Sequence, residues 1–245
     1  MATLQNKVIA SHRREMLNGG MKEVFKHFFT FHQTPDITIN GSTYQETSLR
    51  DILAFTIVHS ALCDHGNIFG GFLCSIYSGT TYKDVDILFR ERKNANRFCE
   101  KINNILENIL GLEYHHYDIV HTTKAYADKF SISVTLDDVS CTLDVDVVSR
   151  DALNTSPSNT IFHPVSWGRT LCYGKTDGLF FRFSSKKLGS KIPTVEYVVD
   201  MLTSQKDIRN TSFAYKPRPG NHESVYERYI DSKFKSIEKD GYDLD

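Results

Sequence analysis

The chain has 245 residues, of which 40% are hydrophobic and 24% are charged, as in an ordinary soluble globular protein. Its 29 Lys and Arg residues nearly balance its 30 Asp and Glu residues, which excludes an overall basic field that would draw the whole protein to nucleic acid. The five cysteines lack zinc-like spacing and no apolar run reaches about 18 residues, so we expect a soluble protein with reduced thiols in the cytoplasm, or the host cytoplasm for a viral chain.

The first part of the chain mixes helix and turn signals. A short amphipathic helix is predicted at 21–32, and a hairpin is predicted to turn at 40–41. A longer helix follows, with an N-cap at Thr47 or Ser48 and a stop at Gly66, because its apolar residues recur at helical spacing.

The stretch "IFGGFLCSIYSGTTYKDVDILF", residues 68–89, joins glycines to aspartates. The pair Gly70 and Gly71 stands between an apolar strand and a helix, and Asp84 and Asp86 alternate with apolar residues in the next strand. Residues i and i+2 of a strand point to the same side. Both carboxylates are therefore predicted to share one face, opposite the core.

A second acidic strand is predicted further along the chain. A helix at 92–111 precedes two runs of two-residue alternation, 130–136 and 141–147, which indicate a hairpin with one buried face. Asp144 and Asp146 lie at alternate positions of its second strand. They are therefore predicted to share a face as well.

The remaining segments carry weaker signals. We expect a strand at 113–123, a loop at 154–160, a strand at 176–183, a helix at 194–205 and a charged surface helix within 219–245.

Two acidic strands and a Gly pair suit phosphate chemistry. Crowded carboxylates repel and raise one another's pKa, and one divalent cation, or two about 4 Å apart, relieves that repulsion. Mg²⁺ fits because it binds through carboxylates, water and substrate phosphates. Glycines let backbone N–H groups approach a polyphosphate at a helix N-terminus. Taken singly, a DxD motif is more often a chance occurrence, a Gly pair is more often a turn, and the acidic strand at 141–147 is more often a solvated strand face. The order of these motifs along the chain favours the functional interpretation.

The same residues carry a resemblance to a family. Gly70-Gly71, then Gly79, then Asp84 and Asp86 match the spacing in the head domain of the DNA polymerase β-like nucleotidyltransferases. The closest branch is that of the class II tRNA nucleotidyltransferases and bacterial poly(A) polymerases. The similarity covers about residues 46–151, and the chain resembles a minimal or viral-type member.

The resemblance implies an α+β fold. We expect a mixed, mostly antiparallel sheet flanked by helices, with a small helical C-terminal lobe. The expected division is an N-terminal extension at 1–45, a nucleotidyltransferase core at 46–155 and a C-terminal lobe at 156–245.

It also implies an activity, the metal-dependent transfer of an NMP from an NTP to a hydroxyl acceptor, with an RNA 3′ end favoured. Asp84, Asp86 and Asp146 would bind two Mg²⁺ or Mn²⁺ ions, with Asp144 as the less favoured metal ligand. The nucleotide would be contacted by Gly70, Gly71, Lys83 and Arg150.

The family's Arg-Asp pair is replaced by Cys74 and Ser75, and no segment resembles the base-selecting helix of the CCA-adding enzymes. Loss of that arginine keeps a second hypothesis open: a catalytically inactive nucleotidyltransferase fold that binds nucleotide or RNA, or serves as an assembly subunit. For an active enzyme, another cation must reach the triphosphate. The sequence offers Lys83, Arg90, Arg150, Lys186 and Lys187.

Overall fold

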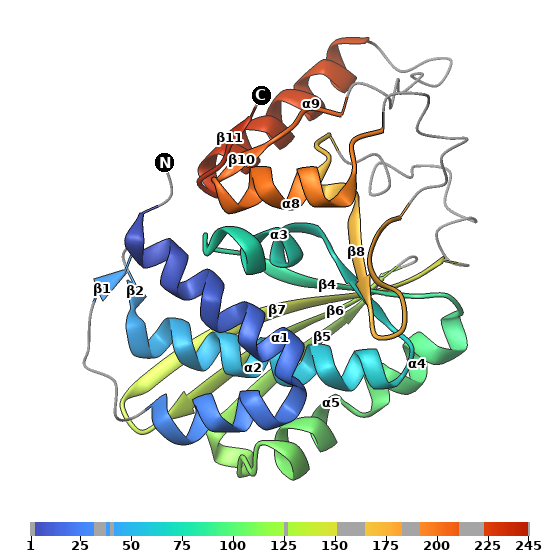
Figure 1. Cartoon of the computed structure of the whole chain (residues 1–245). Helices are drawn as coiled ribbons and strands as arrows, with labels where there is room; N and C mark the ends of the chain where they lie inside the picture. Colours follow the sequence, from blue (N-terminus) through green and yellow to red (C-terminus); the bar gives the residue numbers. More distant parts are fainter. Residues whose placement is uncertain are drawn as a thin grey trace.

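The computed structural model describes residues 3–31, 38–39, 42–124, 127–150, 165–182, 192–210 and 223–244. The fold is α+β, and its centre is a seven-stranded sheet (Figure 1). In spatial order the strands are β5 (Tyr117–Thr123), β6 (Ala127–Leu136), β7 (Val139–Ser149), β4 (Asp84–Phe89), β3 (Asn67–Phe69), β8 (Leu171–Gly174) and β9 (Gly178–Phe181).

The sheet is mixed and mostly antiparallel. Only β4 and β7 pair in parallel, and every other neighbouring pair of this sheet is antiparallel. The strands β8 and β9 extend the sheet beyond β3, although their residues fall within the segment expected to form a C-terminal lobe. The division into extension, core and lobe stays a prediction.

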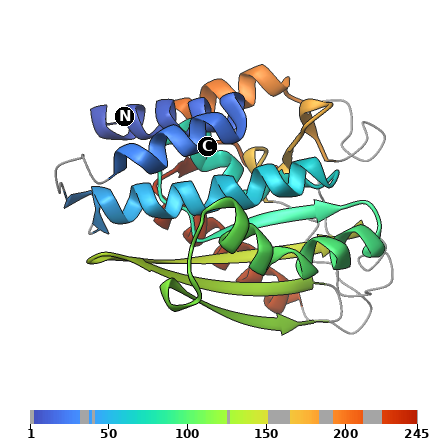
Figure 2. The same cartoon turned by 90° about the horizontal axis from the view of Figure 1, so that it is seen from below.

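Helices flank the sheet. They are α1 (Leu4–Thr30), α2 (Tyr44–Cys63), α3 (Gly70–Ser78), α4 (Arg92–Glu100), α5 (Ile102–Asn104), α8 (Val195–Thr203) and α9 (Glu223–Lys239). Figure 2 shows α2 between α1 and the strands β5 to β7. Two short two-stranded pairs complete the architecture: β1 (Thr38–Ile39) with β2 (Ser42–Thr43), and β10 (Lys206–Asp207) with β11 (Asp243–Leu244).

The core lies between α2 and the sheet. Alternate residues of β6 and β7, including Phe130, Ile132, Leu143 and Val145, are buried, while the residues between them are polar. Burying such apolar side chains contributes about 1.5–3 kcal/mol each. The alternation therefore sets which face of the sheet is covered by α2 and which face carries the polar residues.

Most predicted elements are confirmed. The helix after the Gly pair, the strand that begins at Asp84, the β6–β7 hairpin and the helix after Pro193 are all present. The pair β1 and β2 confirms the hairpin predicted around 40–41.

Several boundaries were wrong. Because α2 begins at Tyr44, Thr47 and Ser48 lie within the helix and do not cap it. The helix predicted at 92–111 is interrupted at Lys101 and continues as a π-helix at Ile105–Ile109. The predicted loop at 154–160 lies outside the described residues.

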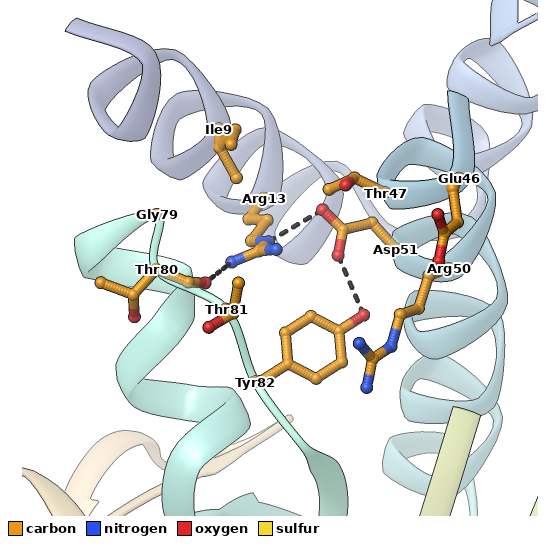
Figure 3. Close-up of a pocket in the computed structure, with 10 residues that line it drawn as sticks. All are labelled: Ile9, Arg13, Glu46, Thr47, Arg50, Asp51, Gly79, Thr80, Thr81 and Tyr82. Atoms are coloured by element: carbon orange, nitrogen blue, oxygen red, sulfur yellow. Dashed lines mark hydrogen bonds and ion pairs between the residues drawn. The ribbon is translucent and has the colours of Figure 1, made fainter. Parts of the chain in front are cut away.

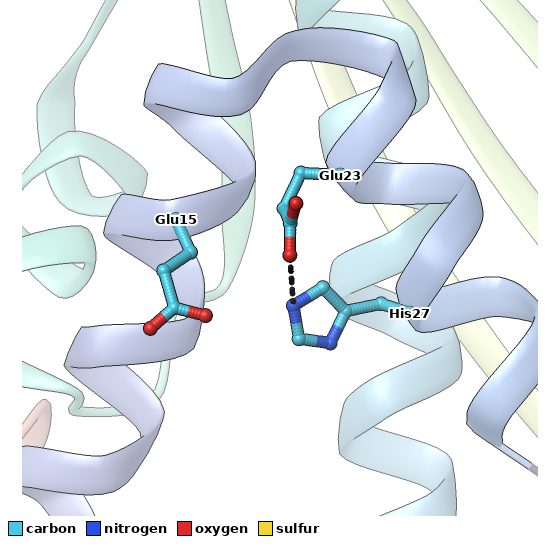
Figure 4. A group of neighbouring side chains, drawn as sticks. All are labelled: Glu15, Glu23 and His27. Carbon is cyan, nitrogen blue, oxygen red and sulfur yellow. Dashed lines mark ion pairs between the residues drawn. The ribbon is translucent and has the colours of Figure 1, made fainter.

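The helix α1 is longer than predicted because it extends back to Leu4, where the Thr3 hydroxyl accepts the Asn6 backbone N–H at 3.1 Å. It is kinked at Gly20, whose φ of 65° is accessible to glycine at little cost. Figure 4 shows that the kink brings Glu15 opposite Glu23 and His27. Glu23 is already paired with Lys26 at 2.6 Å, so we regard this group as a surface ion pair.

Among the residues described, none of the helices combines the length and hydropathy needed to cross a membrane.

Candidate active site

The four aspartates lie side by side on two neighbouring strands. In the parallel β4–β7 pair, Asp84 is in register with Asp144 and Asp86 with Asp146. All four carboxylates therefore project from the same face of the sheet. The intervening Val85 points to the opposite face and is fully buried. The adjacency expected from the sequence is confirmed.

A lysine borders the acidic group from the next strand. Lys129 of β6 is in register with Asp146, and its Nζ lies 3.3 Å from Asp144 Oδ2 and 3.8 Å from Asp146 Oδ1. Lys83 is exposed and its charge also acts on Asp144. Of the four carboxylates, Asp144 is the one that these cations neutralise best.

The pKa values show which aspartates lack such neutralisation. Burial, followed by the charges of Asp84 and Asp146, raises the pKa of Asp86 to about 8. Burial and then the charges of Asp84 and Asp144 also raise the pKa of Asp146, against the opposing effect of Lys129. For Asp144, hydrogen bonds from Ser131 and Lys129 outweigh burial, and its pKa lies below the ordinary value.

One carboxylate oxygen of this group is left without a hydrogen bond. Asp146 Oδ1 is buried and has no hydrogen-bond partner within the part of the chain that the structure describes. A buried carboxylate oxygen that has no hydrogen bond, and whose only ion pair among the described residues is the long one with Lys129, is of the kind that Mg²⁺ and Mn²⁺ prefer as a ligand. Asp84, Asp86 and Asp146 offer ligands of the type that a divalent cation prefers, but their carboxylate oxygens do not all lie within 4.8 Å of one another, so these side chains would have to move closer to hold one ion together.

Gly70 connects the start of α3 to this group. Phe69 is in register with Asp86 in the β3–β4 pair, and Gly70 follows with a φ of 73°. A Cβ atom at Gly70 would collide with Asp86 Oδ2. Glycine is thus required here by both backbone conformation and space, and the N-terminus of α3 lies directly against the aspartates.

Two arginines from later in the chain approach the same helix end. A Cβ atom at Gly71 would collide with Arg169 Nη1, and the Arg182 guanidinium lies 4.6 Å from the centroid of the Phe69 ring. The charges of both arginines act on Asp86 and lower its pKa, although burial and the other aspartates prevail.

The structure describes only some of the other residues considered for the nucleotide. Arg150 is exposed just past the end of β7, and Arg90 is exposed just past the end of β4. Lys186 and Lys187 lie outside the described residues.

The sequence interpretation missed Lys129, Arg169 and Arg182. A signal for Lys129 existed, because a hairpin centred on Asp137-Asp138 necessarily pairs Lys129 with Asp146. No local pattern indicated Arg169, whereas Arg182 stands in a basic segment with nearby aromatic residues, 181–191.

A second polar group holds the turn that leads into β4 (Figure 3). Arg13 Nε donates to Asp51 Oδ2 at 2.8 Å, and Arg13 Nη1 donates to the backbone oxygen of Thr80 at 2.6 Å. The Tyr82 hydroxyl donates to Asp51 Oδ1 at 2.9 Å, and the Arg50 guanidinium lies 4.6 Å from the Tyr82 ring centroid. These contacts tie α1 and α2 to the residues just before Asp84.

Similarity to known proteins is found among solved structures. No family model and no curated protein matches the chain. Among solved structures, the chain is similar to a CCA-adding enzyme in complex with CTP, at 14% identity and a TM-score of 0.34. The match covers 75% of this chain and 46% of that enzyme, so the chain spans less than half of the enzyme's length.

Proposed function

We propose that the protein is a metal-dependent nucleotidyltransferase that moves an NMP from an NTP to a hydroxyl acceptor, with an RNA 3′ end as the favoured acceptor. The observation that carries the proposal is the register of β4 and β7, which aligns four carboxylates on one face beside the N-terminus of α3. The part of β4 and β7 that carries Asp84, Asp86, Asp144 and Asp146 is called the carboxylate edge. A carboxylate edge next to a helix N-terminus combines cation binding with phosphate binding.

The roles follow from how each carboxylate is partnered. Asp84, Asp86 and Asp146 would hold two Mg²⁺ or Mn²⁺ ions, which when bound neutralise phosphate charge and lower the pKa of the attacking hydroxyl. Asp144 is less suited to this role because Lys129 and Ser131 already engage it. In the transfer, the acceptor oxygen forms a bond to the α-phosphorus as the bond to pyrophosphate breaks.

The chain's own groups bind and orient the substrate in this scheme. The backbone at Gly70 and Gly71 opens α3 and offers N–H groups to the phosphates. Lys83, adjacent to Asp84, and Arg150 are further candidates for contact with the nucleotide.

One observation favours the alternative, an inactive nucleotidyltransferase fold that binds nucleotide or RNA or serves as an assembly subunit. Cys74 and Ser75 are both fully buried, so neither reaches a ligand from the position where the related family carries Arg and Asp. Retention of four neighbouring carboxylates beside the single ion-paired Lys129 favours catalysis, since burying surplus negative charge without a further cation costs stability.

Label transfer from each NTP separates the two functions. The protein is incubated with each α-³²P-labelled NTP, Mg²⁺ and a pool of RNAs and proteins, and the destination of the label is followed. We expect label in an acceptor with wild type, none with Asp86→Asn, and wild-type transfer with Asp118→Asn, which alters an exposed aspartate of β5. Nucleotide binding without label transfer under any condition would support the inactive alternative.

A further inference from the structure

Arg169 lies at the first turn of α3 although it is distant in sequence. Its Nη1 occupies the space beside Gly71 that a side chain there would need. Gly71 has an ordinary backbone conformation, so close approach of Arg169 is the feature that requires glycine at this position. Arg169 thus lies against Gly71, and Asp86 lies against Gly70.

The position of Arg169 is held by the end of the chain. Its side chain is 15% exposed, Nη2 donates to Asp240 Oδ2 at 2.9 Å, and its Cζ lies 5.7 Å from the Tyr242 ring centroid. Asp240 follows α9. Its pKa is raised chiefly by burial and further by the negative charge of Asp84 at the carboxylate edge. Arg169 is therefore fixed next to the carboxylates with little rotameric freedom to lose on binding an anion.

Arg169 also remains charged. Burial opposes its charge, but the neighbouring Cys74, Tyr242 and Asp240 outweigh that effect and raise its pKa above the ordinary value. Cys74 lies three residues after Gly71, and so on the same side of α3 as the position that Arg169 contacts. Position 74 is the one from which the resembling family projects its own arginine.

We propose that Arg169, held by Asp240, binds the polyphosphate of the nucleotide and supplies the guanidinium that the buried Cys74 does not. This inference rests on the proposed function, because it assigns the phosphate partner of the same site. A guanidinium presents forked N–H donors that match phosphate oxygens, and α3 adds its N-terminal backbone groups at the same point. Arg182, over Phe69, places a second positive charge near the start of α3.

The test is calorimetric binding of two probes, Mg²⁺·ATP and inorganic triphosphate. Arg169→Gln removes the charge and keeps an amide that can donate to Asp240. We expect about tenfold to hundredfold weaker binding of both probes, as for the loss of charge-assisted hydrogen bonds. The matched control is Arg97→Ala, which removes an exposed arginine of α4 and should leave binding unchanged.

A second variant carries an arginine at position 74 in place of the one at position 169. Cys74→Arg combined with Arg169→Gln returns a guanidinium to the same region from α3, and we expect it to recover part of the lost affinity. A merely structural role of Arg169 would give no recovery, because the ion pair with Asp240 stays broken.

The outcomes separate this inference from the proposed function. Wild-type affinity for both probes in Arg169→Gln would overturn the role of Arg169 and leave the proposed function intact. Failure of the wild-type protein to bind either probe would overturn both. Melting curves of each variant confirm that the folded protein is compared.

Discussion

Tyr82 and Asp84 are separated by one residue along the chain, yet they belong to two polar groups that differ in how their charges are balanced. The anchor group consists of Arg13, Asp51 and Tyr82, and its ion pair and hydrogen bonds satisfy both oxygens of Asp51. The carboxylate edge begins at Asp84 and contains more negative than positive charge. A group that pairs its own charges can hold a fold together, whereas a group with surplus charge needs a partner from outside.

The largest effect is expected from the anchor group. Asp51→Ala leaves the buried Arg13 without its carboxylate, and loss of one partner of a buried ion pair costs about 3–5 kcal/mol. Urea unfolding should show this loss with or without Mg²⁺. Asp144→Ala is the matched comparison at the carboxylate edge, and a similar loss there would contradict the distinction between the two groups.

Gly70→Ala should have the next largest effect. Alanine at a φ of 73° costs about 1–2 kcal/mol, and the collision with Asp86 adds about 1–3 kcal/mol of overpacking. Gly111→Ala is the matched control, because Gly111 has a φ of 65° but a Cβ atom there would meet no atom of the described residues within 4 Å. Equal losses of the free energy of unfolding in both variants would show that α3 does not press against Asp86.

Asp86→Asn should stabilise the metal-free protein. The folded pKa of about 8 lies above the unfolded value of about 3.9, so the folded state holds this proton more tightly. Stability from this group is fully present below about pH 4 and is lost as the pH rises to about 8. In EDTA the variant should melt above wild type by about 2–4 °C for each kcal/mol regained, with a larger difference at pH 8 than at pH 5. A difference independent of pH would contradict the raised pKa.

Lys129→Gln should have the smallest effect on stability. The lysine is 31% exposed, and partly exposed ion pairs contribute about 0–1 kcal/mol. Removing this positive charge should instead increase the affinity of the carboxylate edge for Mn²⁺. Lys93→Gln, on the exposed surface of α4, is the control, and equal Mn²⁺ affinities in the two variants would remove Lys129 from the electrostatics of the site.

The sequence predicted those features that depend on patterns of neighbouring residues. The alternation around Asp84 and Asp86 led to the correct strand, and the Gly pair led to the start of α3. The sequence interpretation expected the two acidic strands to be neighbours, but it did not predict that β4 and β7 pair in parallel. Parallel partners lie far apart along a chain, and no turn between them fixes their register.

Long-range contacts account for what was missed. Arg169 reaches Gly71 through the β3–β8 pairing and is fixed by Asp240 near the C-terminal end. Neither contact leaves a periodic pattern in the sequence. The predicted caps at Thr47 and Ser48 failed because α2 begins at Tyr44. Side chains that can cap a helix are also tolerated inside one, so their presence alone does not locate its start.

The central claim is that the carboxylate edge binds divalent cations for nucleotidyl transfer. Its most direct test is a Mn²⁺ titration followed by electron paramagnetic resonance of the free ion, in wild type, Asp86→Asn and Asp118→Asn. We expect saturable Mn²⁺ binding that Mg²⁺ displaces in wild type and Asp118→Asn, and its loss in Asp86→Asn. Mn²⁺ binding of equal stoichiometry and affinity in Asp86→Asn would contradict the claim, because the ion would then bind elsewhere.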